Sequence, residues 1–370
     1  MKYTRPILLI IAVILIVAAI YRLESVRPEK RSSSTTTGIT VKSENPIIKQ
    51  KEDQYERAKE IVNPSGFINT DPFTIESLIG KKVIMVLFWT YSCINCQRET
   101  PYINAWYDKY HDKGLEIIGV HTPEFDFEKN RNNVASAVKK FGIKYPVVQD
   151  NDYSTWIAYR NQYWPRKYLI DIDGFIAFDQ IGEGGYADME KKIQELLAER
   201  DSRLGIKETI PTGIAKPKVV EMNGLKVKSP ETYFGSGRND YLGNGIPHIA
   251  GMQSLKLPRS LDGNALYLGG QWKFDSEFAG NAAPGAIVKY IYDAKNVYLV
   301  ARADKPVRIK VLKDGKPLGA DAGADVGADG YVTVKDARLY KLIEGSDYGR
   351  HTIELMIQDP GAMLFTFTFG

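Results

Sequence analysis

The two cysteines of this 370-residue chain stand three positions apart, as Cys93 and Cys96. The apolar run at 83–88 predicts a buried strand, and the residues from Cys93 to about Lys109 have helical spacing. The pair therefore lies where a strand leads into a helix, and Cys93 faces unpaired backbone amides and the positive end of the helix dipole, which stabilise a thiolate. We expect Cys93 to be the nucleophile of thiol–disulfide exchange and Cys96 the resolving thiol.

Two other uses of a Cys-x-x-Cys pair fit this sequence less well. A zinc site needs three or four protein ligands, but the sequence has no second cysteine pair and its four histidines are scattered. A structural disulfide across so short a loop would add little stability. We interpret the pair as a redox-active disulfide, with no metal and no bound cofactor.

Residues 64–204 alternate between strand-like and helix-like segments, which predicts an α/β domain around a mixed sheet. The last two strands are expected to form a hairpin through a turn at 172–174. The expected strands are 82–88, 115–120, 145–148, 167–171 and 175–178, and the expected helices are 93–110, 134–141 and 188–200.

This order of elements, with Trp89 four residues before Cys93 and Pro165 ahead of the hairpin, resembles the thioredoxin fold. The resemblance implies that Pro165 is the cis-proline beside the cysteines and that Trp164, before it, offers its backbone to a bound peptide. Trp89 is then a further substrate-binding residue. An ordinary trans-proline at a strand start is the alternative for Pro165.

The sequence also departs from thioredoxin itself. Leu87 stands where thioredoxin has a buried aspartate, whereas Glu99, three residues after Cys96, matches a glutamate of the TlpA and ResA group. A carboxylate beside the resolving thiol can take its proton as a general base. The alternative for Glu99 is a solvated charge on an exposed helix face.

A narrower resemblance is to the thioredoxin-like part of DipZ proteins. It is carried by the segments 91–96, 119–125, 163–165, 168–171 and 182–186, and it continues to 365–370. DipZ proteins usually carry a many-helix membrane domain, whereas this sequence has one hydrophobic segment. The resemblance therefore implies a separate membrane electron donor of the CcdA or DsbD type.

A linker at 205–218 leads to a second half, residues 219–370, in which apolar residues alternate strictly at 353–357 and at 365–369. This pattern predicts an all-β antiparallel sandwich. The DipZ resemblance implies a jelly roll similar to carbohydrate-binding modules. Tyr233, Tyr241 and Trp272 lie beside turns and are candidates to stack on cell-wall sugars, with burial in the sandwich core as the alternative.

The chain begins with a segment typical of membrane targeting, in which Lys2 and Arg5 precede an uncharged apolar run at 7–20. Such a helix reaches only about 21 Å at ~1.5 Å per residue, against ~30 Å of hydrocarbon core, so a span needs flanking residues. We predict a single-pass anchor at 1–21, with a cleaved signal peptide as the alternative. A polar stem, 22–63, follows and ends in a short helix within 50–61.

The absence of any cysteine outside the reactive pair suits an oxidising compartment, where stray thiols would mispair. We therefore expect the catalytic part outside the cytoplasm, at the cell membrane, or secreted if the N-terminal segment is cleaved. The net charge of +4 is too small to indicate nucleic-acid binding.

These features predict a membrane-anchored thiol–disulfide oxidoreductase that reduces protein disulfides, with a role like that in cytochrome c biogenesis. Two alternatives stay open. One is a thiol peroxidase, because Thr90 to Cys93 matches the T-x-x-C of peroxiredoxins and Arg160 or Arg166 would stabilise the thiolate, although Val86 replaces an expected proline. The other is a surface glycan-binding protein with a vestigial redox domain.

Overall fold

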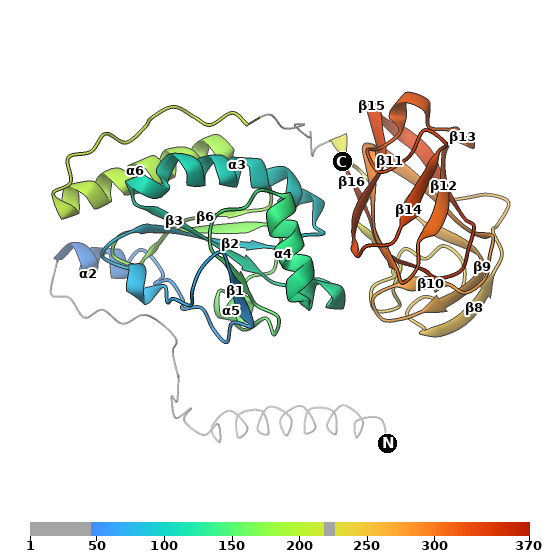
Figure 1. The fold of residues 1–370 in the computed structure, drawn as a ribbon, viewed down its shortest axis with the longest axis horizontal. Helices are drawn as coiled ribbons and strands as arrows, with labels where there is room; N and C mark the ends of the chain where they lie inside the picture. Colours follow the sequence, from blue (N-terminus) through green and yellow to red (C-terminus); the bar gives the residue numbers. More distant parts are fainter. Residues whose placement is uncertain (1–45, 218–225) are drawn as a thin grey trace, which may run out of the picture. The chain divides into compact units, whose positions relative to one another are not determined.

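The computed structural model describes residues 46–217 and 226–370, which form a thioredoxin-like half and a β-rich half (Figure 1). The predicted anchor, 1–21, and more than half of the predicted stem lie outside the described residues. Within the described residues, no helix is both long enough and apolar enough to cross a membrane.

A mixed sheet forms the centre of the thioredoxin-like half, as predicted, but it has six strands, because the strand at 66–68 was not among the expected ones. Its strand order is β1-β4-β3-β2-β5-β6, with β2, β3 and β4 parallel to one another and the other pairings antiparallel. The strands are β1 (Gly66–Ile68), β2 (Val83–Trp89), β3 (Leu115–His121), β4 (Val147–Gln149), β5 (Arg166–Ile170) and β6 (Ile176–Ile181).

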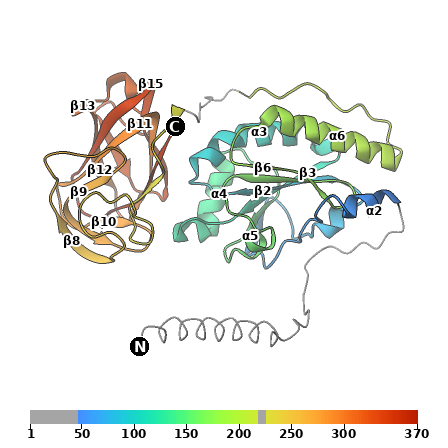
Figure 2. The same ribbon diagram turned by 180° about the vertical axis from the view of Figure 1, so that it is seen from behind.

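Both faces of this sheet are covered. Helices α3 and α6 lie over one face and α5 over the other, in both views (Figure 1, Figure 2). Every residue of β2 is buried, and its residues alternate between two hydrophobic cores, which explains its uninterrupted apolar sequence. The helices are α2 (Pro46–Glu52), α3 (Ile94–Tyr110), α4 (Arg131–Lys140), α5 (Ser154–Ala158) and α6 (Tyr186–Leu204), with single 3₁₀ turns at Glu76–Leu78, His111–Lys113 and Asp126–Lys129.

The short helix predicted within 50–61 is misplaced, because α2 begins and ends earlier. An ion-pair cluster fixes it there: the Lys51 ammonium contacts Asp171 at 2.7 Å, Asp173 at 2.9 Å and Glu199 at 2.5 Å. The cluster ties the helix to the β5–β6 turn and to α6. The partners of Lys51 lie more than a hundred residues away, so spacing within the stem could not predict the position of this helix.

The β-rich half is a ten-stranded sheet in which all pairings between the named strands are antiparallel. Two long strands, β11 and β15, run side by side and contribute to one hydrophobic core. The strands are β7 (Thr232–Tyr233), β8 (Gly251–Leu255), β9 (Leu266–Phe274), β10 (Ala279–Asn281), β11 (Ala286–Ala303), β12 (Val307–Lys313), β13 (Lys316–Pro317), β14 (Tyr331–Val334), β15 (Arg338–Ile357) and β16 (Ala362–Phe369), with a 3₁₀ turn at Gly319–Asp321.

Trp272 belongs to this core. Its side chain is fully buried and its indole N–H donates to the carbonyl of Gly269 at 3.0 Å. The sugar-stacking role predicted for Trp272 is therefore wrong, and the alternative, a core aromatic, is confirmed. Tyr241 remains exposed, whereas Tyr233 is half-buried.

A bulge in β16 turns Phe365 away from the core to which strict alternation assigns it. Val300 pairs with Thr366 and Ala301 with Leu364, so Phe365 is an extra residue in the ladder. Its ring packs instead on rings of the thioredoxin-like half, at 5.0 Å from Phe125 and 4.9 Å from Phe127 between centroids. The two halves thus share a hydrophobic core.

The predicted linker also belongs to this packing. Residues 205–217 lie along α3 and α6: the Tyr110 hydroxyl donates to the Pro211 carbonyl at 3.1 Å, and the Ala215 amide donates to Glu190 at 2.7 Å. The segment before the β-rich half is therefore held on the thioredoxin-like half by hydrogen bonds.

Removing the Phe365 ring should uncouple the two halves. We expect Phe365→Ala to lower the free energy of unfolding by about 3–5 kcal/mol, as for other buried phenylalanines, and to split thermal unfolding into two transitions. Differential scanning calorimetry measures both. Tyr241→Ala, at an exposed aromatic of the same half, is the matched control. A single transition with an unchanged midpoint in Phe365→Ala would contradict the shared core.

Candidate active site

Cys93 caps the helix that carries Cys96. Its backbone is extended (φ −71°, ψ 118°), and its sulfur accepts a hydrogen bond from the Cys96 amide at 3.3 Å. Both residues are free thiols; Cys93 is partly exposed, whereas Cys96 is buried. Burial beside Cys93 raises the pKa of the Cys96 thiol well above its usual range. A disulfide partner can therefore reach Cys93, and Cys96 needs a base before it can react.

The loop before β5 lies beside Cys93. The Trp164–Pro165 peptide bond is cis, which confirms the prediction for Pro165. The Trp164 carbonyl oxygen is 3.9 Å from the Cys93 sulfur, and the Trp164 indole donates to the Thr122 carbonyl at 3.1 Å. Trp164 and Cys93 line the same cleft, so the predicted substrate-binding loop is next to the predicted nucleophile.

Trp89 does not line this cleft. Its side chain is only 2% exposed and packs edge-on against His121, with ring centroids 5.1 Å apart. The substrate contact predicted for Trp89 is therefore corrected to a supporting role beneath the active-site turn. Strand β2 ends at Trp89, inside the domain, and this placement decides its burial.

Glu99 lies inside the protein and not on a solvated helix face. Its carboxylate is 1% exposed and contacts the fully buried ammonium of Lys167 at 2.6 Å. Burial raises the Glu99 pKa to about 7, and the charge and hydrogen bond of Lys167 oppose the rise. The other carboxylate oxygen, Oε1, has no hydrogen-bond partner among the described residues.

This arrangement suits proton transfer. Residues three apart on a helix lie on one face, so Glu99 and Cys96 are neighbours on α3, and the Glu99 charge contributes to the raised pKa of the Cys96 thiol. A carboxyl group that titrates near neutral pH, with one oxygen free, can accept the thiol proton. Sequence reasoning found Glu99 but missed Lys167, whose partner lies 68 residues away.

A second buried carboxylate, Glu128, holds the active-site turn. One oxygen accepts from the Ser92 hydroxyl at 2.6 Å and the Ser92 amide at 3.2 Å; the other accepts from the amides of Glu124 at 2.6 Å and Phe125 at 3.1 Å. Burial raises the Glu128 pKa to about 6. Glu128 thereby joins the residue before Cys93 to the loop that contacts Phe365. The sequence offered no motif for it.

The residues of the peroxidase alternative have other contacts. Thr90 is fully buried, and its hydroxyl lies 3.5 Å from the His121 ring nitrogen Nε2. Arg160 contacts Glu56 at 2.5 Å, and Arg166 contacts Asp179 at 2.7 Å. Both guanidinium groups are thus paired with carboxylates.

The β-rich half supplies one wall of the active-site cleft, which sequence reasoning did not foresee. This cleft, of about 560 Å³, is lined by Cys93 and Trp164 on one side and by Glu231, Tyr233 and Arg238 on the other. Arg238 lies over the Tyr233 ring at 3.7 Å, and both bind Glu124, at 3.0 and 2.9 Å. Although Glu231 is exposed to the cleft, protein surrounds it, and this desolvation raises its pKa to about 8.

Comparisons with known proteins agree with this geometry. The family described as "AhpC/TSA family" matches residues 56–178, and "Thioredoxin like C-terminal domain" matches residues 229–370. Protein DipZ of Mycobacterium bovis is 37% identical over 85% of this chain and 43% of its own length, so the chain spans less than half of DipZ. The thiol-disulfide oxidoreductase YkuV of Bacillus subtilis is 30% identical over 38% of this chain and 95% of YkuV. ResA of Bacillus thuringiensis, another thiol-disulfide oxidoreductase, is 31% identical over 34% of this chain and 74% of ResA.

Replacing one partner of the buried Glu99–Lys167 ion pair should lower the free energy of unfolding more than replacing both partners. Lys167→Met leaves the Glu99 carboxyl without its cation, and we expect a loss of about 3–5 kcal/mol in the free energy of unfolding. Glu99→Gln/Lys167→Met should lose clearly less. Urea denaturation measures both, with Lys144→Met at the exposed Lys144–Asp108 pair as the control. Equal losses in the single and double variants would contradict the coupling.

The Glu99 pKa predicts opposite pH trends for stability and for rate. Its pKa is about 7 in the fold against an ordinary 4.5, so its contribution to stability is complete below pH 4.5 and is lost as pH rises through about 7. The rate of Cys96 attack should rise through the same interval, because the carboxylate form accepts the proton. Stopped-flow kinetics and unfolding titrations should show both trends in the wild type and neither in Glu99→Gln/Lys167→Met.

Proposed function

The chain belongs to the thioredoxin-like thiol–disulfide oxidoreductases and is a DipZ homologue over most of its length, and on this basis we propose that it reduces protein disulfides outside the cytoplasm. The observation that carries the proposal is the buried Glu99 carboxyl beside Cys96. A base next to the resolving thiol speeds the step in which Cys96 releases the substrate as a thiol. The match of Glu99 to the TlpA and ResA group supports reduction as the direction.

The exchange proceeds in two steps. The Cys93 thiolate attacks one sulfur of the substrate disulfide; the substrate S–S bond breaks, a mixed disulfide forms, and the first substrate thiolate leaves and takes a proton from water. Cys96 then gives its proton to Glu99 and attacks the Cys93 sulfur. The second substrate thiolate leaves, the Cys93–Cys96 disulfide forms, and two electrons have passed to the substrate.

Each turnover requires a donor that returns two electrons to the Cys93–Cys96 disulfide. We propose a separate membrane protein of the CcdA or DsbD type as this donor, with residues 1–21 as the anchor that keeps the chain near it. The single cysteine pair of the sequence supports the extracytoplasmic placement. Reduction of apocytochrome c is the substrate role that the ResA likeness suggests.

A thiol peroxidase is the second candidate, favoured by the T-x-x-C pattern and the AhpC/TSA match. The pairing of Arg160 with Glu56 and of Arg166 with Asp179 leaves the proposed thiolate without the cation that this candidate would use. Carbohydrate binding by the β-rich half stays a prediction. Tyr233 and Tyr241 are its remaining candidate residues, because Trp272 is buried in the core.

Trapping separates the roles of the two cysteines. We expect Cys96→Ala to accumulate mixed disulfides with extracytoplasmic proteins, because Cys93 attacks and nothing resolves the product, whereas Cys93→Ser accumulates none. Non-reducing electrophoresis of cell-envelope extracts measures this difference. Equal trapping by both variants would contradict the assignment. Consumption of hydrogen peroxide by the wild type at a rate above its reduction of protein disulfides would favour the peroxidase.

A further inference from the structure

Two cavities meet beside Cys93. The active-site cleft described above ends at Ile94, and Ile94 also lines a second cavity of about 660 Å³ between α3, α4 and the β-rich half. The wall from the β-rich half is continuous between them, because Asn296 of the second cavity neighbours Phe369 of the cleft: Val297 pairs with Phe369, and the Asn296 amide donates to the Gly370 carbonyl at 2.7 Å. Together they form one groove across the active-site turn.

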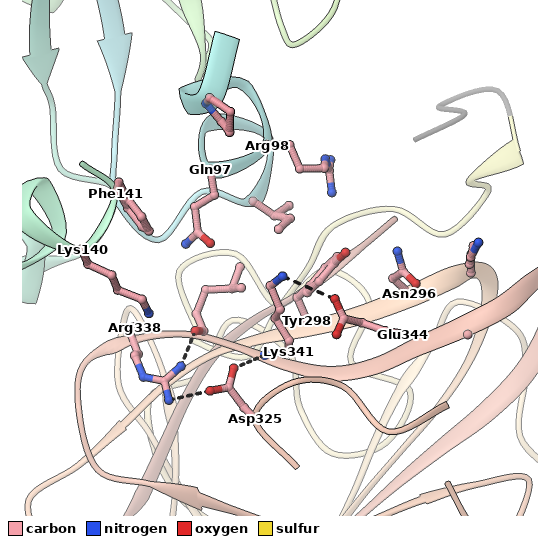
Figure 3. Close-up of a pocket in the computed structure, with 15 residues that line it drawn as sticks. Gln97, Arg98, Lys140, Phe141, Asn296, Tyr298, Asp325, Arg338, Lys341 and Glu344 are labelled. Atoms are coloured by element: carbon pink, nitrogen blue, oxygen red, sulfur yellow. Dashed lines mark hydrogen bonds and ion pairs between the residues drawn. The ribbon is translucent and has the colours of Figure 1, made fainter. Parts of the chain in front are cut away.

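The second cavity is basic. Its lining carries five cationic side chains and only two carboxylates: Arg98, Lys140, Lys295, Arg338 and Lys341 against Asp325 and Glu344. Figure 3 shows Lys140 entering it from α4 and Lys341 from the opposite wall, with the Arg338–Asp325 and Lys341–Glu344 contacts drawn.

Ion pairs leave part of this positive charge unbalanced. Arg338 contacts Asp325 at 2.8 Å, Lys341 contacts Glu344 at 3.4 Å, and Arg98 contacts Glu183 at 2.9 Å. The side-chain ammonium groups of Lys140 and Lys295 have no direct hydrogen bond or ion pair within the described part of the chain. One of these lysines comes from each half, so this second cavity, the basic end of the groove, exists only where the halves meet.

The other end of the groove differs in charge. Its acidic and basic side chains beside Cys93 are Glu124, Glu231 and Arg238, and Arg238 is already bound to Glu124 at 3.0 Å. Positive charge is therefore concentrated on the α4 side of Ile94 alone. A ligand that crosses the groove meets Cys93 first and unpaired lysines next.

We propose that this groove binds an extended segment of the substrate protein, with its disulfide at Cys93 and acidic side chains beside the reactive cysteine in the basic end. Each cavity is as large as a typical small-ligand site, about 300–1,000 Å³, so the two together hold several residues of a polypeptide. The inference rests on the proposed function and names its substrate class: disulfides flanked by aspartate or glutamate.

The test uses the pre-reduced full-length chain and two homodimeric peptide disulfides of equal length. One peptide has glutamates beside its cysteine and the other has lysines, and a fluorophore–quencher pair reports reduction in a single turnover. We expect the wild type to reduce the glutamate peptide about tenfold faster at low salt, and the preference to shrink in 0.5 M NaCl. Bis(2-hydroxyethyl) disulfide, small and uncharged, reports the chemistry alone.

Two double variants test whether Lys140 and Lys295 cause the preference for the glutamate peptide. Lys140→Glu/Lys295→Glu should abolish or reverse it and leave the rate with the small disulfide unchanged. The matched control, Lys191→Glu/Lys316→Glu, changes one exposed lysine on each half away from the groove and should keep it. Equal rates for both peptides in the wild type would overturn the proposal that the groove binds acidic segments. A preference that survives Lys140→Glu/Lys295→Glu would also overturn it. Failure to reduce any of the three disulfides would instead overturn the proposed function.

Discussion

The sulfur of Cys93 occupies the capping position of α3, and the rest of the site depends on this constraint. A cap must lie outside the helix and accept from its first turn, which fixes the Cys93 sulfur 3.3 Å from the Cys96 amide. Strand β2 must then end at Trp89, and the loop that carries Pro165 must come close enough for the Trp164 carbonyl to lie 3.9 Å from the same sulfur. One thiol is thereby presented and the other covered.

Two buried carboxylates, Glu99 and Glu128, have different roles next to the Cys93 cap. Glu99 lies under Cys96 and is held by Lys167, whereas Glu128 accepts four hydrogen bonds that tie Ser92 to the 124–125 loop. Burial raises the pKa of both groups towards neutrality. Their partners set their roles, since Glu99 keeps a free oxygen for a proton and Glu128 uses both oxygens to hold backbone.

The β-rich half is part of the site and not an appendage. Phe365 packs on the Phe125 and Phe127 rings, next to the loop that Glu128 holds, and Glu124 of that loop binds Tyr233 and Arg238. The same contacts that join the halves thus position the second wall of the cleft. A thioredoxin-like half alone would present Cys93 on an open surface, with neither Glu231 nor Lys295 near it.

The sequence by itself determined the order of the longer strands and helices, the Cys93–Cys96 junction, the position of Pro165 and the burial of β2, because periodicity and short spacings encode local geometry. It did not indicate the short elements β1 and α5. It could not determine the depth of Glu99, since i,i+3 spacing fixes a shared helix face but not what covers it. Lys167 and Glu128 act on residues 68 and 36 positions away, and no local pattern marks such partners. The Phe365 side chain does not point into the core of the β-rich half, where strict alternation places it, because the pairing of β16 with β11 contains a bulge at this residue. Only the tertiary structure sets that register, and with it the wall that completes the active site.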